Sequence, residues 1–394
     1  MVLSRQAFTS VTEDPLGRAW NTTFRELGFG VTKDPYSGRG VGAWSTPASI
    51  DPKTRTRSYA ASAYLAPVRG RLNLHVVTGA MVSRIVLQRT KAKGVNFRQK
   101  DSGAEGHQAQ ATREVILAAG AFQSPKRLEL SGIENKLILE KYDIAIRVEN
   151  ESVGENLQDH LMTGISFEAA DGVMTGDCLL RQEPEFVNAF TPEHQQLFSD
   201  SLAKSEAQVE SIGTDFEKAH HKYVASVLKG HFQDEASAAL FMLPAQVDLH
   251  NGPKQSGMVS NVKPGNYISL GAALLHPLSW GSSHISSADP SAPPVIDQRY
   301  LSHPLDVEVF ARHIMALEVL AETPPLATYL KPDGRRAQGH DGKNAHATTL
   351  EKARKYVKET TLTNNHPVGT CAMLPLEKGV AEKAADLIKE DHAL

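Results

Sequence analysis

A histidine in a constrained setting is the residue best placed to carry chemistry in this chain. His366 lies in the stretch TNNHPVGTCAM (363–373), directly before Pro367. Proline fixes its own backbone and pushes the preceding residue toward an extended conformation, so we expect His366 on a stiff corner outside any regular helix. An imidazole held in this way suits a general base, since its ordinary pKa is about 6.5. A lone histidine is more often a structural hydrogen-bonding group, so the motif by itself leaves both roles open.

Two further motifs carry weaker chemical signals. Gly38, Gly40 and Gly42 invite comparison with a phosphate-binding loop. The residues before them, TKDPYS, do not form the buried strand that a dinucleotide fingerprint requires, and no G-x-G-x-x-G occurs in strand–turn–helix context elsewhere. Asp159 and His160 are adjacent, and adjacent side chains of a strand point to opposite faces. A structural role is therefore favoured over an acid–base pair.

The composition is that of an ordinary globular protein and excludes some partners. Of the 394 residues, 41% are hydrophobic and 22% are charged, and the formal net charge is −3. Without a basic surface the chain is not expected to bind nucleic acid. No apolar run approaches the roughly 20 residues of a membrane span, and the N-terminus lacks the apolar core of a secretory signal. We therefore expect no membrane partner and a cytoplasmic location for the chain as given.

The metal-ligating residue types show no recognisable spacing. Only two cysteines occur, Cys178 and Cys371, which excludes a disulfide framework and a cysteine zinc site. Four histidines of the second half lack a spacing such as His-x-x-x-His, namely His276, His284, His303 and His313. The sequence therefore predicts no metal site.

The elements expected to position these residues change character along the chain. A short helix is predicted over 16–27, and runs rich in Val and Ile predict a β-meander over 72–118 whose most buried strand is 115–118. Residues 171–265 have the composition of a lid, with one helix over 192–203 and an irregular charged stretch after it. Strand character then returns over 268–287, and three helices are predicted over 305–322, over 349–358 with a Thr348–Glu351 capping box, and over 380–390.

The end of the predicted meander leads directly into a helix. Gly120 permits a tight exit from the strand, and Ser124 with Pro125 forms a good N-cap and first-turn pair. Small residues at 131–132 close the helix. Such a joint often presents backbone N–H groups to an electron-rich ligand, although the pattern alone slightly favours an ordinary strand–helix connection.

Several segments together resemble the glucose–methanol–choline (GMC) family of flavin oxidoreductases, in its fungal form. The two most specific are AAGAFQSPKRLELSGI (118–133) and NNHPVGTCAM (364–373). Four others occur in the family's order, namely the regions 58–88, 153–160 and 274–306 and the final VAEKAADLIKE (380–390). The resemblance covers most of the chain.

The resemblance implies a mixed α/β fold. An FAD-binding α/β domain is expected to interleave with a substrate domain built on an antiparallel sheet. Along the chain we assign 1–160 to a partial FAD-binding domain, 161–264 to a lid or insertion of the substrate domain, and 265–394 to an incomplete C-terminal substrate and catalytic domain.

The resemblance also implies a cofactor and site residues. Val82 matches the valine whose backbone contacts the adenine of FAD, and Ala119 with Gly120 matches the turn that lies against the cofactor. His366 matches the histidine that accepts a proton when an alcohol is oxidised, and Asn365 beside it is assigned to the substrate site. The expected partner is a small-molecule alcohol, and flavin would carry the redox chemistry.

The chain also departs from the family pattern. It begins downstream of the glycine-rich unit that binds the ADP half of FAD, and LPLEKG (374–379) joins the final VAEKAADLIKE directly, as an internal deletion would. The second catalytic histidine or asparagine is therefore expected to be missing, and His392 is not accepted in its place. These losses should weaken flavin binding, and an exposed apolar edge is expected where the first strand of the family would pair.

Three functions remain open from the sequence. The leading interpretation is an FAD-dependent alcohol dehydrogenase or oxidase of fungal secondary metabolism. The second is a flavin-binding relative that performs a non-redox cyclisation. The third is an inactive, truncated remnant that is not an enzyme.

Overall fold

The computed structural model describes residues 15–31, 41–43, 49–51, 53–54, 56–99, 106–173, 183–187, 192–212, 215–229, 235–249, 264–336 and 347–372. Several sequence features lie outside these residues, namely Gly38, Gly40, Cys178, the stretch 374–379, the predicted helix over 380–390 and His392.

Contacts divide the chain into two compact units, each assembled from three separate stretches. Unit 1 consists of Met1–Leu74, His160–Leu278 and His303–Asn364, and unit 2 of His75–Asp159, Ser279–Ser302 and Asn365–Leu394. The predicted mixed α/β fold with interleaved parts is confirmed. The contiguous ranges assigned from the sequence do not follow these units.

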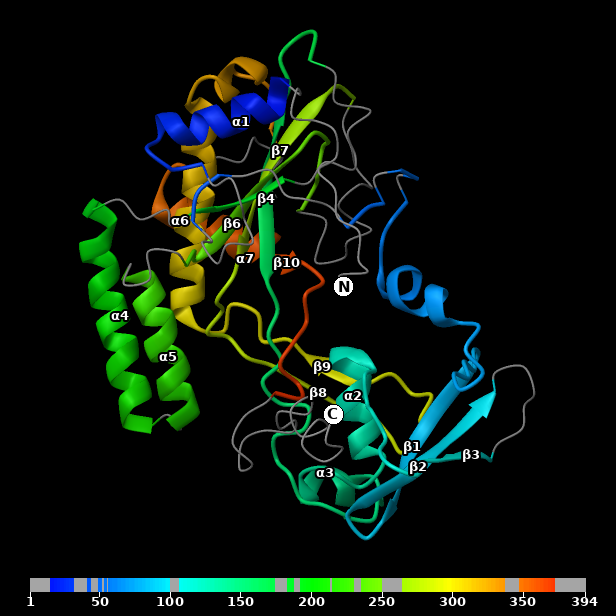
Figure 1. Cartoon of the computed structure of the whole chain (residues 1–394). Coiled ribbons are helices and arrows are strands. Elements are labelled where there is room, and N and C mark those ends of the chain that lie inside the picture. The colour runs from blue at the N-terminus through cyan, green and yellow to red at the C-terminus, as the bar shows by residue number, and fades with distance from the viewer. Residues whose placement is uncertain are drawn as a thin grey trace. The chain divides into compact units, whose positions relative to one another are not determined.

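Unit 1 is built on a five-stranded antiparallel sheet (Figure 1). Its strands, in the order β10-β4-β7-β6-β5, are Leu362–Thr363, Leu161–Glu168, Tyr267–Leu274, Ala238–Leu243 and Glu183–Val187. The central strand β7 is buried at every position, because both of its faces are covered. Gly271 of β7 lies under the ring of Phe241, where a Cβ atom would come within 2.3 Å of the ring. The absence of a side chain at this position therefore lets an aromatic ring pack on the sheet.

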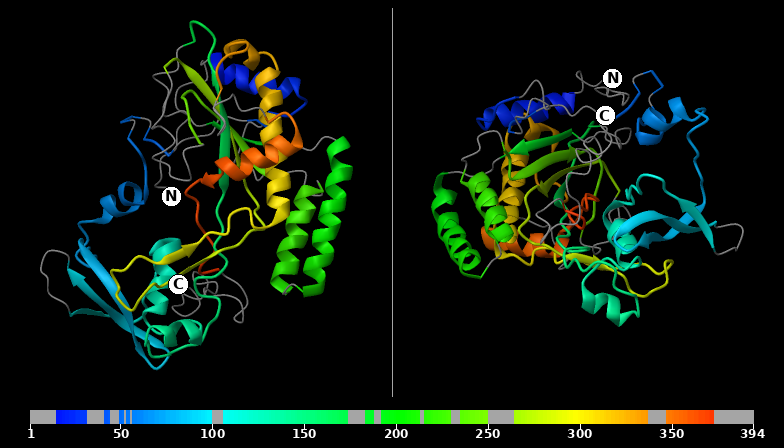
Figure 2. Two further views of the ribbon diagram at one scale, coloured as in Figure 1. Left: turned by 180° about the vertical axis from the view of Figure 1, so that it is seen from behind. Right: turned by 60° about the horizontal axis from the view of Figure 1, so that its bottom comes forward.

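Helices α6 (Pro304–Glu322) and α7 (Leu350–Thr360) pack against this sheet (Figure 2). The other described helices of unit 1 are α1 (Pro15–Glu26), α4 (Pro192–Ile212) and α5 (Asp215–Leu228), with short helical turns η1 (Ala61–Leu65), η2 (Ala66–Val68) and η4 (Leu326–Tyr329). The predicted helices at α1 and α6 are confirmed. The irregular charged stretch predicted after residue 203 is wrong, because α4 continues to Ile212 and α5 follows it. The N-cap of α7 is Thr349 rather than Thr348, since the Thr349 hydroxyl accepts from the Lys352 N–H at 3.3 Å.

Unit 2 combines small sheets with two helices. Its three-stranded antiparallel sheet has the order β1-β2-β3, and its other elements are β8, β9, α2 and α3. The bounds are β1 Ala80–Gln88, β2 Lys91–Gln99, β3 His107–Gln110, α2 Gly120–Glu129, α3 Lys136–Lys141, β8 Ser282–His284 and β9 Val295–Asp297. Helix α2 packs against both β1 and β8.

The predicted buried strand over 115–118 is wrong. These residues are extended but belong to no strand, and Ile116 is 75% exposed. Val77, in the first run of the predicted meander, is likewise outside any strand and 60% exposed. A strand exists only where a neighbour supplies its hydrogen bonds, and no described segment pairs with these residues. Both segments therefore leave apolar side chains exposed, Val77 and Ile116.

The core of unit 1 contains a histidine that is kept neutral. His313 of α6 is fully buried, and its Nε2 atom lies 2.9 Å from the Ser237 hydroxyl. Burial, with a smaller contribution from the positive charge of Arg312, lowers the pKa of His313 to about 3.

This lowered pKa makes stability depend on pH in a defined direction. As the pH falls below about 6.5, the unfolded chain binds a proton at this position and the folded chain does not, so stability decreases toward pH 3. In the wild type this one proton lowers the unfolding free energy by at most about 1.4 kcal/mol for each pH unit between pH 6.5 and 4. We expect His313→Gln to lack this part of the loss. Urea unfolding at a series of pH values measures this slope. The exposed His107→Gln variant should keep the wild-type slope, and an unchanged slope in His313→Gln would refute the assignment.

Candidate active site

Unit 2 contains all five residues that the sequence assigns to the site. They are Val82, Ala119, Gly120, Asn365 and His366. They come from three segments that are far apart in the chain, and hydrogen bonds within unit 2 join these segments. The cofactor turn and the histidine loop therefore belong to one structural unit.

The cofactor turn forms the first residues of helix α2. Ala119 is the N-cap, and Gly120 has φ +82°, a conformation that glycine adopts at no steric cost. The helix begins here and not at Ser124 as predicted, because the Ser124 hydroxyl accepts from the Ala119 N–H at 3.1 Å from within the helix. The first N–H groups of a helix have no acceptor inside it, and residues 118–120 are exposed. This end of α2 thus offers backbone donors at the positive end of the helix dipole.

A proline inside α2 connects this helix to the histidine loop. Pro125 has no N–H, so it cannot donate to the carbonyl of Ala121 one turn earlier. The hydroxyl of Thr370 donates to that carbonyl instead, at 2.5 Å. The carbonyl of Thr370 in turn accepts from the Gly154 N–H at 3.0 Å. The loop that carries His366 is therefore fixed to the first turns of α2.

The backbone of the histidine loop is held by a buried carboxylate. Asp159 is 4% exposed; its Oδ1 atom accepts from the His366 N–H at 3.0 Å, and its Oδ2 atom accepts from the Tyr300 hydroxyl at 2.8 Å. Two residues on, Val368 and Gln158 exchange backbone hydrogen bonds of 2.9 Å each way. The His366 side chain is exposed. A rigid backbone with an outward-facing imidazole is what a general base requires, and Asp159 has the structural role favoured by the sequence.

Val82 lies at an irregularity of β1. Its partner on β2 is Phe97, but the next paired residue is Arg84, so the regular register is broken at Ser83. A break of this kind turns backbone groups away from the ladder. The carbonyl of Ser83 accepts from the Arg127 guanidinium of α2 at 3.4 Å. The predicted adenine-contact residue is therefore linked to the same helix as the cofactor turn.

The structure also assembles a polar group that the sequence did not predict. His284 of β8 lies with its Nδ1 atom 2.8 Å from Oε1 of Glu129 and its Nε2 atom 3.0 Å from Oε1 of Glu155. Burial lowers the pKa of His284, but these two hydrogen bonds outweigh it and raise the pKa to about 10. Burial raises the pKa of the neighbouring Glu134 carboxyl to about 8. The residues have no regular spacing in the sequence, so no motif signals the group.

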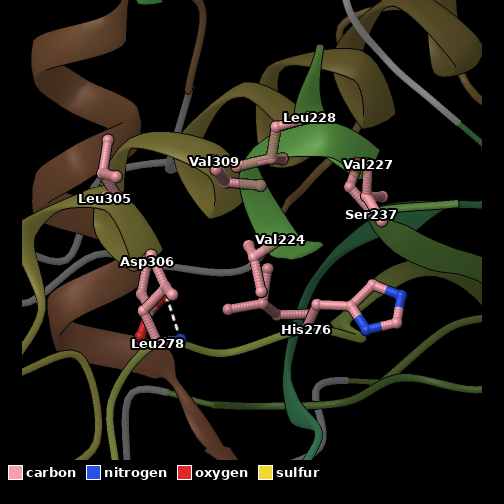
Figure 3. Close-up of a pocket in the computed structure, with 10 residues that line it drawn as sticks. Val224, Val227, Leu228, Ser237, His276, Leu278, Leu305, Asp306 and Val309 are labelled. Carbon is pink, nitrogen blue, oxygen red and sulfur yellow. Dashed lines mark hydrogen bonds between the residues drawn. The ribbon is translucent and has the colours of Figure 1, made fainter. Parts of the chain in front are cut away.

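A small enclosed cavity lies in unit 1 and is lined by none of the predicted site residues. Figure 3 shows its lining of aliphatic side chains from α5 and α6, with Val224, Leu228 and Val309 among them. Its volume is about 10 Å³, room for about one water molecule. Asp306 at its edge accepts from the Leu278 N–H at 2.8 Å (Figure 3). This cavity is a packing feature rather than a ligand site.

Comparison with known proteins places the chain in a family. Residues 8–162 and 277–387 match the N-terminal and C-terminal profiles described as GMC oxidoreductase. The chain belongs to the GMC oxidoreductase family. Dehydrogenase citC of Monascus ruber is 32% identical over 384 residues, covering 86% of this chain and 59% of the relative. The GMC oxidoreductase family protein Mala s 12 of Malassezia sympodialis is 32% identical over 385 residues, covering 94% of this chain and 58% of the relative.

Solved structures show the same fold. An FAD-dependent oxidoreductase from Chaetomium thermophilum superposes with a TM-score of 0.77 at 21% identity, covering 96% of this chain and 72% of that protein. A fungal aryl-alcohol oxidase superposes with a TM-score of 0.67 at 25% identity, covering 93% and 63%. The chain thus spans about three fifths of the length of its curated relatives. FAD is the cofactor of this family.

Among the helices that the structure describes, none is both long and apolar enough to cross a bilayer.

The loop geometry generates a prediction at Gly369. This residue has φ +99°, and a Cβ atom there would lie 2.0 Å from the Asn156 carbonyl oxygen. Gly369→Ala should therefore lower the unfolding free energy by about 1–3 kcal/mol, through backbone strain and displacement of the loop. Thermal unfolding measures the change. Gly30→Ala is the matched control, because its Cβ atom would meet nothing within 4 Å and its φ is not positive. Equal midpoints for the two variants would contradict the close approach.

Proposed function

We propose that this chain is the FAD-binding and proton-accepting part of a GMC oxidoreductase that oxidises an alcohol. One observation carries the proposal. The hydrogen bond from Thr370 to Ala121 joins the cofactor turn to the histidine loop within unit 2. Each segment alone is a moderate signal, and their direct connection supports a common site.

Two features of the chain suit FAD. Residues 118–120 are exposed, and apart from the Ala119 N–H, which donates to Ser124, the first N–H groups of α2 have no acceptor inside the helix. This arrangement favours an electron-rich ring edge beside Ala119 and Gly120. The register break at Ser83 places backbone next to Val82 outside the regular ladder of β1 and β2. A backbone group there would contact the adenine ring of FAD. When bound, FAD supplies the hydride acceptor of the reaction.

His366 would accept the hydroxyl proton of the alcohol. A neutral imidazole has the required acceptor nitrogen, and Asp159 fixes the backbone from which the side chain projects. Asn365, with φ +58°, turns the chain immediately before the histidine and would place its side-chain amide beside the substrate hydroxyl. The roles of these residues are binding, orientation and proton transfer.

The substrate class rests on relatives. The fungal aryl-alcohol oxidase, at 25% identity, supports a small or aromatic alcohol. The resemblance to fungal dehydrogenases extends the proposal to alcohols formed in secondary metabolism.

The test begins with flavin binding. The purified chain is refolded with FAD, separated by gel filtration, and examined for a visible flavin band that co-elutes with the protein. Anaerobic addition of benzyl alcohol and other alcohols should then bleach the band. His366→Ala should retain the flavin and bleach about 10²–10⁴-fold more slowly, the range for loss of a general base. His107→Ala, which removes an exposed histidine of β3, should match the wild type.

The outcomes separate the competing functions. A flavin band that no alcohol bleaches would overturn the redox proposal and favour the non-redox cyclisation. A colourless chain would favour the inactive remnant. Bleaching that is unaffected in His366→Ala would remove this histidine from the mechanism while leaving the oxidoreductase assignment intact.

A further inference from the structure

A second group of chemically active side chains lies in unit 2, separate from the residues proposed for alcohol oxidation. Glu129 ends helix α2, Glu134 follows it in the connection to α3, and His284 ends β8. One ligand atom from each of the three lies within 4.8 Å of the other two. Glu129 and Glu134 are both 0% exposed. Two carboxylates and an imidazole therefore converge on one buried point.

Glu134 is the observation that points to a ligand. Neither of its carboxyl oxygens has a hydrogen-bond partner of good geometry among the described residues, although the neighbouring Asn135 N–H is close enough to lower the pKa of the carboxyl slightly against the larger effect of burial. Burying a carboxylate without a partner is costly. The backbone of Glu134 is nevertheless fixed on both sides, since its N–H donates to Val148 at 3.2 Å and its carbonyl accepts from Asn150 at 3.3 Å. The fold thus holds an unsatisfied carboxylate in a defined place.

The surroundings of His284 match those of a metal-bound histidine. Its Nε2 atom lies 3.0 Å from Glu155, so Nε2–H can donate to that carboxylate. An ion at the cluster would displace the proton that Nδ1 shares with Glu129 and bind Nδ1 in its place. A carboxylate behind a ligating imidazole is the usual outer contact that fixes its tautomer and orientation. Glu129 uses Oε2 to accept from the Ile285 N–H at 2.6 Å, while its Oε1 faces His284.

We propose that Glu129, Glu134 and His284 form a binding site for a divalent transition-metal ion, with Zn²⁺ or Mn²⁺ as the class of occupant. The mixed donor set of carboxylate oxygen and imidazole nitrogen suits these ions, whereas Mg²⁺ and Ca²⁺ prefer oxygen alone. Three carboxylates surround a single imidazole when Glu155 is included, and a dication offsets this excess negative charge. The ion would satisfy Glu134 and pin the end of α2 to β8.

The experiment uses the full chain without a histidine tag, freed of metal by EDTA and dialysed. Equilibrium dialysis against Zn²⁺ or Mn²⁺, with metal measured by mass spectrometry, gives stoichiometry and affinity, and thermal unfolding gives an independent signal. We expect one ion per chain, a raised midpoint and no comparable effect of Mg²⁺. Glu134→Gln, which keeps the shape of the side chain, should abolish the midpoint shift. Glu155→Ala, which removes the outer contact, should weaken binding by about 10–100-fold.

Controls distinguish a metal site from a structural ion pair. Glu235→Gln alters a more exposed carboxylate that lies 2.9 Å from His276 in unit 1, and it should leave metal binding unchanged. Glu134→Gln in the metal-free state should be at least as stable as the wild type, because it replaces a buried carboxyl group that has no hydrogen-bond partner among the described residues. A wild-type chain that binds no ion, or a Glu134→Gln variant that binds as tightly, would overturn the site. A destabilised metal-free Glu134→Gln chain would also overturn it, since the carboxylate would then serve the protein itself.

Discussion

The missing N–H of Pro125 is the constraint from which the geometry of the site follows. A helix with a proline in its interior leaves one carbonyl of the preceding turn without a donor, and a buried carbonyl in that state is costly. In this chain the carbonyl belongs to Ala121 and the donor is Thr370, which is 249 residues away in sequence. The proline thus leaves a carbonyl that needs an external donor, and Thr370 supplies it from a distant part of the chain. This hydrogen bond sets the histidine loop against the start of α2.

Two buried carboxylates elsewhere in unit 2 also join distant segments, by accepting hydrogen bonds from backbone N–H groups. Asp159 receives the backbone N–H of His366, and Glu129 receives that of Ile285, across 207 and 156 residues. A carboxylate that accepts from a backbone N–H forms a stronger bond than a neutral acceptor does. Such contacts fix main-chain segments that have little regular secondary structure of their own. The site residues are therefore placed mainly by side-chain-to-backbone bonds and less by a continuous sheet.

Local signals in the sequence predicted the elements that depend on local physics. Apolar periodicity predicted α6, and turn residues with alternating Val and Ile predicted β1 and β2. The strand over 115–118 was wrong because pairing depends on a distant neighbour, and α5 was missed because its charged surface obscured the apolar stripe. The cap at Ser124 was wrong for a related reason. Its hydroxyl bonds backward to Ala119, which no pattern of residue types distinguishes from a forward cap.

His366 and Gly120 were singled out by their local motifs, but Val82 and Asn365 and the cofactor role of the turn were reached only through family resemblance. Nothing in the spacing of 119, 159 and 366 indicates that they share a unit, because their connections are tertiary. The resemblance assigned no role to Glu129, Glu134 or His284, and their spacing in the sequence is not that of metal ligands. The cluster became visible only when the fold brought α2, its following loop and β8 together. Long-range polar contacts are thus the feature of this protein that could not be predicted from its sequence.

Hydrogen–deuterium exchange of the segment 364–372 measures whether the Thr370 hydroxyl holds the histidine loop to α2. Thr370→Val removes the hydroxyl while keeping the side-chain shape, and Thr370→Ser retains the hydroxyl. We expect faster exchange of this segment in Thr370→Val and nearly wild-type exchange in Thr370→Ser, with β1 and β2 unchanged in both. Wild-type exchange in Thr370→Val would contradict this expectation, because the loop would then be held without the bond to Ala121.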